Sequence, residues 1–293
     1  MGLRETIPAV GHQKFLTGLI GAPIAHSASP AMHGQAADAL GIRCHYQLIE
    51  VAGAGLAELR ALLASIKRIG FVGVNVTFPY KEAVVPLLDE LSERAAAIGT
   101  VNTVVARDGR LTGHNTDSTG FAAAFASVLG NPGDKPIVLV GAGGVGRAIA
   151  FALAALGARA LHIVDADSRK AEALSARLEA RMAVRVFGDV RAALDGAGGV
   201  INGTPVGMPP NRDTPVPANL LHAGMFVVDA VYTPLWTPLL LAARAAGCRV
   251  MTGRDLAIDQ AVDAFRLFTG FEPSREPIAA AFDGVIAKRD AAK

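Results

Sequence analysis

The segment that most restricts the fold is an apolar run that leads directly into a glycine turn. Residues 137–140 read Ile-Val-Leu-Val, residues 141–146 read Gly-Ala-Gly-Gly-Val-Gly, and an Ala- and Leu-rich stretch follows to residue 156. This is the G-x-G-x-x-G spacing, placed between a predicted strand and a predicted helix. The segment therefore predicts a strand, a tight turn and a helix packed closely together.

The spacing of these glycines predicts a dinucleotide site. The first glycine permits the sharp turn, the second lets the backbone approach a pyrophosphate, and the third lets the helix pack closely on the strand. Free amide groups at the helix start, with the positive end of its dipole, provide the anion site. The alternative is a glycine-rich turn that serves packing alone. The residues predicted to contact the cofactor here are Gly141, Ala142, Gly143, Gly144, Val145 and Gly146.

The next strand-like segment, residues 160–164, ends at Asp165, where a ribose-binding acid belongs in this pattern. A carboxylate there accepts hydrogen bonds from the ribose hydroxyls of NAD and repels the 2′-phosphate of NADP. Ala166 follows, where a phosphate-binding site often has Arg. Arg169 and Lys170 either soften this repulsion or are solvated residues of the helix start. We predict a preference for NAD, with NADP as the alternative cofactor.

Strand-length apolar runs alternate with helix-length stretches along the whole chain, which predicts α/β architecture with mostly parallel sheets. We expect a helix to begin at Ser29-Pro30, with Ser29 as its N-cap, and two short helices at 81–87 and 91–98. The division predicted is an N-terminal α/β substrate-binding domain, residues 1–116 plus 257–293, and a doubly wound dinucleotide-binding domain, residues 117–256. The predicted strands are residues 15–20, 46–51, 70–76, 101–106, 136–140, 160–164, 199–202, 226–229 and 249–251.

Composition narrows the functional classes. With 51% hydrophobic and 18% charged residues, the 293-residue chain is unlike a disordered protein. A net charge of +2 argues against a nucleic-acid-binding protein. Apolar stretches are too short for a membrane span, and residues 1–14 lack the apolar region of a secretory signal, so we expect a cytoplasmic protein. Cys44 and Cys248 lack CxxC spacing, which predicts neither a disulfide framework nor a metal site.

Polar side chains gather in three places in the first half of the chain, at residues 26–30, 75–81 and 113–117. Polar residues at the carboxyl ends of parallel strands line the crevice where α/β proteins bind ligands. Their hydroxyls, amides and a Lys–Asp pair suit a small polyol that carries a carboxylate. No G-x-S-x-G nucleophile motif occurs.

These segments resemble the shikimate dehydrogenase family, including its quinate/shikimate branch, from about Leu16 to Gly270. Residues 21–30 resemble the family's substrate-carboxylate loop, and Asn-Val-Thr-Phe-Pro-Tyr-Lys at 75–81 is similar to its catalytic-lysine motif. Val-Asn-Thr at 101–103, Asn-Thr-Asp at 115–117, and residues 229–232 with Pro234 and Thr237 match further motifs. Gly34 departs from the pattern, where Asn is frequent. The resemblance implies a Rossmann-type nucleotide domain beside the substrate domain.

The resemblance also implies roles for individual residues. Lys81 and Asp117 would form the catalytic acid–base pair; without the motif, Lys81 reads as a solvated lysine, and Tyr232 and Gln260 as packing or surface residues. The substrate-binding residues implied are Ser27, Ser29, Thr77, Lys81, Asn102, Asp117, Tyr232 and Gln260. Beyond the glycine turn, the cofactor-binding residues are Asp165, Arg169, Thr204, Val231 and Gly253.

The activity implied is reversible, NAD(P)-dependent hydride transfer between a ring hydroxyl of shikimate or quinate and the 3-dehydro ketone. Oxidising that alcohol requires a group that takes up the hydroxyl proton, and Lys81 is the candidate. We expect a small-molecule substrate, no nucleic-acid or membrane partner, no metal, and a monomer or homodimer. The alternatives are an NADP-preferring or aminoshikimate-type dehydrogenase, and a non-catalytic protein that binds a shikimate-like ligand.

Overall fold

The computed structural model describes residues 13–291, which form two compact units. Unit 1 comprises residues 13–92, 101–114 and 261–291, and unit 2 comprises residues 93–100 and 115–260. The predicted boundaries differ from this division mainly at residues 93–100, which group with unit 2. Arg177 Nη1 donates to Ala97 O at 3.0 Å, and Asn115 Nδ2 donates to Thr100 O and Thr100 Oγ1 at 3.0 and 2.9 Å; these hydrogen bonds join the segment to unit 2.

Unit 1 is built on a six-stranded sheet in the order β2-β1-β3-β5-β6-β4. Its strands are β1 (Lys14–Gly21), β2 (Arg43–Glu50), β3 (Gly73–Val76), β4 (Glu90–Leu91), β5 (Thr103–Arg107) and β6 (Arg110–His114). β1 pairs in parallel with β2 and β3, whereas β5 runs antiparallel to both β3 and β6. Of these six strands, β5 alone runs opposite to the others, because β4 pairs in parallel with β6, so the sheet is mostly parallel, as predicted. The chain reverses between β5 and β6 in a tight hairpin at Asp108-Gly109, where both residues have positive φ (52° and 73°).

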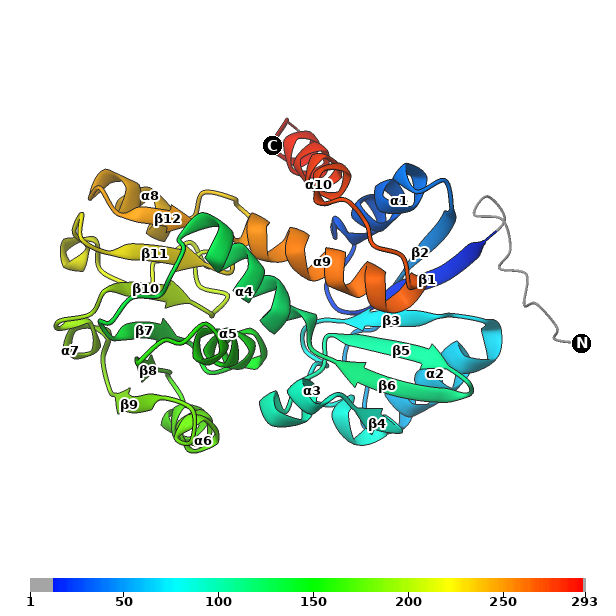
Figure 1. The fold of residues 1–293 in the computed structure, drawn as a ribbon, viewed down its shortest axis with the longest axis horizontal. Helices are drawn as coiled ribbons and strands as arrows, with labels where there is room; N and C mark the ends of the chain where they lie inside the picture. Colours follow the sequence, from blue (N-terminus) through cyan, green and yellow to red (C-terminus); the bar gives the residue numbers. More distant parts are fainter. Residues whose placement is uncertain (1–12, 292–293) are drawn as a thin grey trace, which may run out of the picture. The chain divides into compact units, whose positions relative to one another are not determined.

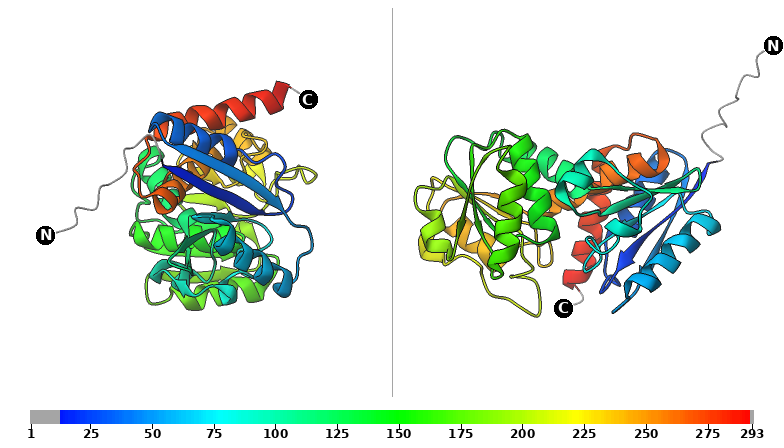
Figure 2. Two further views of the ribbon diagram at one scale, coloured as in Figure 1. Left: turned by 90° about the vertical axis from the view of Figure 1, so that its right-hand side faces the viewer. Right: turned by 90° about the horizontal axis from the view of Figure 1, so that it is seen from below.

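The helices of unit 1 cover both faces of its sheet. They are α1 (Ser29–Ala39), α2 (Leu56–Ile69), the 3₁₀ turn η2 (Val85–Leu87), the second half of α9 (Gly253–Thr269) and α10 (Arg275–Ala291). α1 packs against β2 and along α10 (Figure 2). His33 of α1 stacks on Tyr46, whereas Ile66 of α2 lies beside His45, on the opposite side of β2.

Two local predictions in unit 1 are wrong. Ser29 is the first residue of α1 and Ala28 is its N-cap; the Ser27 hydroxyl accepts a hydrogen bond from the Ser29 amide instead. The helix expected over residues 81–87 is reduced to η2. Pro86 has no N–H to continue a helical hydrogen-bond pattern.

Unit 2 is built on a second six-stranded sheet, in the order β12-β11-β10-β7-β8-β9, and all its pairings are parallel (Figure 1). Its strands are β7 (Ile137–Val140), β8 (Ala160–Val164), β9 (Ala183–Phe187), β10 (Gly199–Asn202), β11 (Phe226–Asp229) and β12 (Arg249–Met251). Its helices are α3 (Glu93–Ile98), α4 (Thr116–Val128), α5 (Gly144–Ala155), α6 (Ser168–Leu178), α7 (Val190–Leu194), the 3₁₀ turn η3 (Ala218–Leu220), α8 (Pro238–Ala245) and the first half of α9. The strand order reverses between β7 and β10, which is where such sheets bind ligands.

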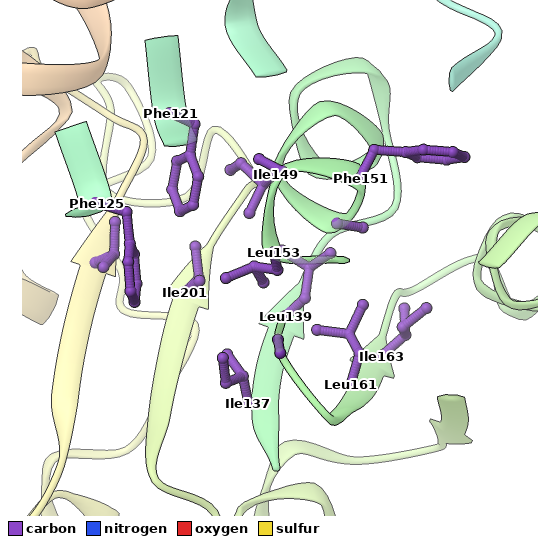
Figure 3. Close-up of a cluster of buried hydrophobic side chains, with 14 of the residues drawn as sticks. Phe121, Phe125, Ile137, Leu139, Ile149, Phe151, Leu153, Leu161, Ile163 and Ile201 are labelled. Carbon is purple, nitrogen blue, oxygen red and sulfur yellow. The ribbon is translucent and has the colours of Figure 1, made fainter. Parts of the chain in front are cut away.

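The core of unit 2 lies on both faces of this sheet because successive residues of each strand point to opposite sides. On one face, Leu139 packs with Phe121 and Phe125 of α4 and with Ile149 of α5 (Figure 3). On the other face, Val138 packs with residues of α7 and α8, such as Ala193, Leu239 and Leu240. Strands that are buried on both faces explain the continuous apolar runs in the sequence.

Within residues 13–291, no helix has both the length and the apolar character needed to cross a bilayer. The expectation that the chain lacks a secretory signal concerns residues 1–14, most of which lie outside the described residues.

Candidate active site

The glycine turn of unit 2 leaves no room for side chains at two of its positions. Gly141 has a φ of +100°, and its amide donates to Val164 O at 2.8 Å. A Cβ on Gly146 would lie 1.9 Å from Gly141 O, and one on Gly141 would lie 2.6 Å from the Thr204 methyl group. The turn, the start of α5 and the exit of β10 are therefore packed backbone to backbone, as the glycine spacing predicts.

The start of α5 has the features of an anion site. Gly143 is the N-cap, and no side chain caps the helix there. A Cβ on Gly143 would meet nothing within 4 Å, so the space in front of the helix is open. Backbone N–H groups at a helix start, together with the helix dipole, bind phosphate groups. These residues fit the pyrophosphate of a dinucleotide.

Asp165 follows β8 directly and is joined to the glycine turn. Its Oδ2 accepts a hydrogen bond from the Ala142 amide at 2.6 Å, and its Oδ1 accepts one from the Asp167 amide at 2.8 Å. Each carboxylate oxygen has a second lone pair with which it can accept a hydrogen bond from a ribose hydroxyl. The predicted ribose-binding acid is thus held in place by backbone donors.

Arg169 is paired with a second acid next to this position. Its Nε and Nη2 donate to Oδ1 and Oδ2 of Asp167 at 3.0 and 3.1 Å. This hydrogen bonding lowers the pKa of Asp167 and raises that of Arg169. Asp167 also caps α6 through the Arg169 amide. The guanidinium charge is therefore balanced locally, a feature that sequence reasoning missed because Asp167 reads as an ordinary N-cap.

Just after β10, beside the point where the strand order reverses, Thr204 donates its hydroxyl proton to Asn202 Oδ1 at 2.6 Å. Asn202 in turn donates to Asp229 Oδ1 at 3.0 Å, and Asp229 also accepts hydrogen bonds from the Val231 amide and the Thr237 hydroxyl. Burial raises the pKa of Asp229 to about 6, against the effect of these three donors. This network connects the ends of β10 and β11, where Thr204 and Val231 lie.

Gly253 begins α9 just after β12 and lies against the segment that follows β11. A Cβ at this position would lie 2.6 Å from both Ala230 O and Val231 O. Gly253 is therefore required for the close approach of α9 to the segment that carries Val231 and Tyr232. Tyr232 is half-buried.

Asp117 and Gln260 lie on two helices of unit 2 that touch. A Cβ on Gly120 of α4 would lie 2.4 Å from the backbone nitrogen of Gln260 in α9. Asp117 is one turn before Gly120, hence on the same face of α4. It is only 7% exposed and sits in the first turn of the helix, where the dipole favours a carboxylate. Asn115 caps this helix by accepting a hydrogen bond from the Ser118 amide at 3.0 Å.

In unit 1, Ser27 and Ser29 lie together at the start of α1. The Ser27 hydroxyl donates to Ser29 Oγ at 3.1 Å. The loop that carries them is joined to the lysine segment, because the Ala22 amide donates to Phe78 O at 3.1 Å. A Cβ on Gly21 would lie 2.3 Å from the Thr77 methyl group, so the two segments are in direct contact.

Lys81 follows β3 in a turn that is closed by the Tyr80 amide donating to Thr77 O at 2.9 Å. Tyr80 is buried; its hydroxyl donates to Val51 O at 2.6 Å and accepts from the Ala54 amide at 2.9 Å. Lys81 O accepts a hydrogen bond from the Val101 amide at 2.8 Å, beside Asn102. The structure therefore brings Lys81 and Asn102 into neighbouring segments of unit 1.

The predicted site residues divide between the units. Those of unit 1 are Ser27, Ser29, Thr77, Lys81 and Asn102; those of unit 2 are Asp117, Tyr232, Gln260 and all the predicted cofactor-binding residues. Sequence reasoning assigned no role to Tyr46 or Thr103. Tyr46 is linked to Asn102 through Asn75, and the Thr103 hydroxyl donates directly to Asn102 Oδ1. Within residues 13–291, no group of three or more His, Cys, Asp or Glu residues is arranged to hold a metal ion.

A glycine turn at the switch point of a parallel sheet, with an acid at the end of the next strand, defines unit 2 as a Rossmann-type nucleotide-binding unit. Residues 19–104 match the model of the shikimate dehydrogenase substrate binding domain. The chain is 46% identical to a shikimate dehydrogenase (NADP(+)) of Streptomyces avermitilis, over 88% of this chain and 91% of that protein. It is 43% identical to a quinate/shikimate dehydrogenase (NAD(+)) of Corynebacterium efficiens, over 93% and 99%.

Among solved structures, quinate dehydrogenase from Corynebacterium glutamicum in complex with NAD superposes with a TM-score of 0.86, at 42% identity, over 93% of this chain and 100% of that one. The chain belongs to the shikimate dehydrogenase family of oxidoreductases, which includes quinate/shikimate dehydrogenases. The predicted family and the predicted two-domain α/β fold are confirmed.

Proposed function

We propose that this protein is an NAD-preferring quinate/shikimate dehydrogenase. It would interconvert a ring hydroxyl of shikimate or quinate and the corresponding 3-dehydro ketone. The observation that carries the cofactor assignment is the Asp165 carboxylate, held at 2.6 Å from the Ala142 amide of the glycine turn. A fixed negative charge there favours the ribose hydroxyls of NAD and opposes a 2′-phosphate. The Asp167–Arg169 pair adds support, since the nearest guanidinium already has a carboxylate partner.

When bound, the nicotinamide accepts or returns the hydride. We assign the exchange of the hydroxyl proton to Lys81 Nζ, because the oxygen changes protonation state as the hydride moves. As a neutral amine, Nζ takes the proton when the alcohol is oxidised, and as an ammonium it returns the proton when the ketone is reduced. Asp117 accepts a hydrogen bond from a substrate hydroxyl, and with Lys81 forms the acid–base pair. The backbone arrangement supports this assignment: Val101 and Asn102 donate to Lys81 O and His114 O, respectively, and Asp117 follows His114 by three residues.

We assign substrate binding and NAD binding to different parts of the sequence. Residues 1–116 and 257–293 would hold most of the substrate, with Ser27 and Ser29 on its carboxylate and Thr77, Asn102 and Gln260 on the rest of the molecule. Asp117 and Tyr232, from residues 117–256, would also bind substrate. Residues 117–256 would hold NAD through the glycine turn and through Asp165, Arg169, Thr204, Val231 and Gly253.

The test is the absorbance change of reduced nicotinamide with purified protein, using shikimate and quinate in turn, each with NAD and with NADP. We expect turnover with at least one of the two substrates and a higher kcat/KM with NAD. A higher kcat/KM with NADP would overturn the cofactor assignment. Shikimate binding measured by calorimetry without any turnover would instead identify a non-catalytic ligand-binding protein.

A further inference from the structure

Three strands of the unit 1 sheet present polar side chains on one buried face. Tyr46 of β2 is in register with Thr17 of β1, and Asn75 of β3 is in register with Leu19 of β1 and Thr103 of β5. Register partners, and residues two apart on one strand, point to the same face of a sheet. Tyr46, Asn75 and Thr103 therefore face the same side. They are 7%, 6% and 0% exposed.

These side chains form a hydrogen-bonded chain that ends at Asn102. The Tyr46 hydroxyl donates to Asn75 Oδ1 at 2.8 Å. Asn75 Nδ2 donates to Thr103 Oγ1 at 3.0 Å and to Asn102 O at 3.2 Å. The Thr103 hydroxyl donates to Asn102 Oδ1 at 3.2 Å.

The hydrogen bonds from Tyr46 to Asn102 all run in one direction, because only certain atoms of each group can donate. An amide nitrogen only donates and an amide oxygen only accepts, whereas a hydroxyl has one proton to give. Because Tyr46 supplies a proton to Asn75 Oδ1, the Asn75 amide must present Nδ2 to Thr103. Thr103 then accepts from Asn75, and its own proton goes to Asn102 Oδ1. The orientation of the Asn102 amide is thus linked to a tyrosine 56 residues earlier in the sequence.

The tyrosine is itself fixed. Its ring stacks on the buried His33 ring with centroids 4.6 Å apart, and it packs with Leu19 and Ile24. A rotation of the phenol away from Asn75 would have to displace this packing. Tyr46 is therefore held by packing as well as by its hydrogen bond to Asn75.

We propose that Tyr46, Asn75 and Thr103 are positioning residues, which hold the Asn102 amide so that Oδ1 faces Thr103 and Nδ2 is the group that donates to a substrate oxygen. This inference rests on the proposed function, in which Asn102 binds substrate. An inverted Asn102 amide would present an acceptor where a donor is needed. Tyr46, Asn75 and Thr103 thus contribute to substrate affinity without touching substrate.

The experiment compares variants that differ by one hydroxyl group. Thr103→Val keeps the shape of the side chain and removes the hydroxyl, Thr103→Ser keeps the hydroxyl, and Tyr46→Phe removes the first donor of the chain. Thr17→Val is the matched control: Thr17 is equally buried in the same sheet, but its hydroxyl contacts Cys44 Sγ and His45 O rather than Asn75. The readouts are substrate KM and kcat at saturating NAD, the Kd of NAD, and Tm.

We expect Thr103→Val and Tyr46→Phe to raise substrate KM about tenfold, in line with a lost or inverted buried hydrogen bond, with an unchanged Kd for NAD. Thr103→Ser should restore KM, and Thr17→Val should lower Tm alone. An unchanged KM in Thr103→Val or Tyr46→Phe would overturn the inference, as would an equal rise in Thr17→Val. If the wild-type protein turns over neither shikimate nor quinate, the proposed function fails, and the inference with it.

Discussion

The carboxylate of Asp165 accepts a hydrogen bond at 2.6 Å from the amide of Ala142, so the end of β8 and the glycine turn are joined at one point. We expect Asp165→Ser to lower the ratio of kcat/KM for NAD to that for NADP by about tenfold or more. The variant removes the charge that opposes a 2′-phosphate, and one tenfold step corresponds to only about 1.4 kcal/mol. Steady-state kinetics with both cofactors measures this ratio.

Asp189→Ser is the control for that comparison. Asp189 also accepts backbone hydrogen bonds in unit 2, from the amides of Arg191 and Ala192, but it caps α7. Its replacement should leave the cofactor ratio unchanged. An unchanged ratio in Asp165→Ser would remove this carboxylate from the account of specificity.

The two glycines on either side of the α5 start should respond differently to alanine. In Gly146→Ala, the new Cβ would lie 1.9 Å from Gly141 O, so the turn cannot keep its geometry, and both Tm and NAD affinity should fall. In Gly143→Ala, the φ of −74° suits any residue and the Cβ meets no protein atom within 4 Å. Tm should therefore change little while NAD affinity falls, because the methyl group occupies the space intended for pyrophosphate. Calorimetry with NAD and thermal melts separate the two effects; wild-type affinity in Gly143→Ala would contradict the anion site.

Replacing the proposed acid–base lysine should affect turnover more than binding. We expect Lys81→Ala to lower kcat by roughly 10²–10⁴-fold, the range for a positioned proton-transfer group, with a smaller change in substrate KM. Lys67→Ala is a suitable control in the same unit, since Lys67 forms an ion pair with Asp89 at 3.0 Å. Near-normal kcat in Lys81→Ala would exclude the proposed role.

Protonation of His33 should make the protein sensitive to acid. Burial lowers the pKa of His33 to about 3, from 6.5 in the unfolded chain, and neither ring nitrogen has a hydrogen-bond partner among the described residues. The unfolded state therefore takes up a proton that the folded state resists. The contribution of His33 to stability is complete above pH 6.5 and is lost as the pH falls toward 3. Between pH 7 and pH 5 the loss is about 2 kcal/mol.

The variant His33→Phe keeps a ring between Tyr46, Phe265 and Phe268 but cannot be protonated. Urea unfolding at pH 7 and pH 5 should show a smaller loss of stability in this variant than in the wild type. The exposed His222 provides the control, because His222→Ala should retain the wild-type difference. The same difference in His33→Phe would show that other groups cause the acid sensitivity.

The elements that could be predicted from the sequence are those with a local signal. The turn at residues 141–146 combines glycine spacing with an apolar strand before it and a helix after it, and the structure has all three. The predicted strands at 199–202, 226–229 and 249–251 match β10, β11 and β12, because buried parallel strands read as short apolar runs.

The elements that were missed lack such a signal. β6 reads Arg-Leu-Thr-Gly-His and is held as a strand by its pairing with β5, which lies outside the segment itself. β9 is an edge strand, and no residue in it is fully buried. The series of hydrogen bonds from Tyr46 to Asn102 depends on sheet register. The register places the Tyr46 hydroxyl 2.8 Å from Asn75 Oδ1, although the two residues are 29 positions apart. A single sequence carries no local trace of such a contact.

One helix has a consequence for how the protein unfolds. α9 runs unbroken from Gly253 to Thr269, yet its residues up to Gln260 belong to unit 2 and those from Ala261 onward to unit 1. Its fully buried side chains include Ile258 in the first half and Phe265 in the second. Because helical hydrogen bonds form cooperatively, melting the middle of α9 withdraws apolar groups from both cores. Loss of this one helix would therefore disturb the packing of both units.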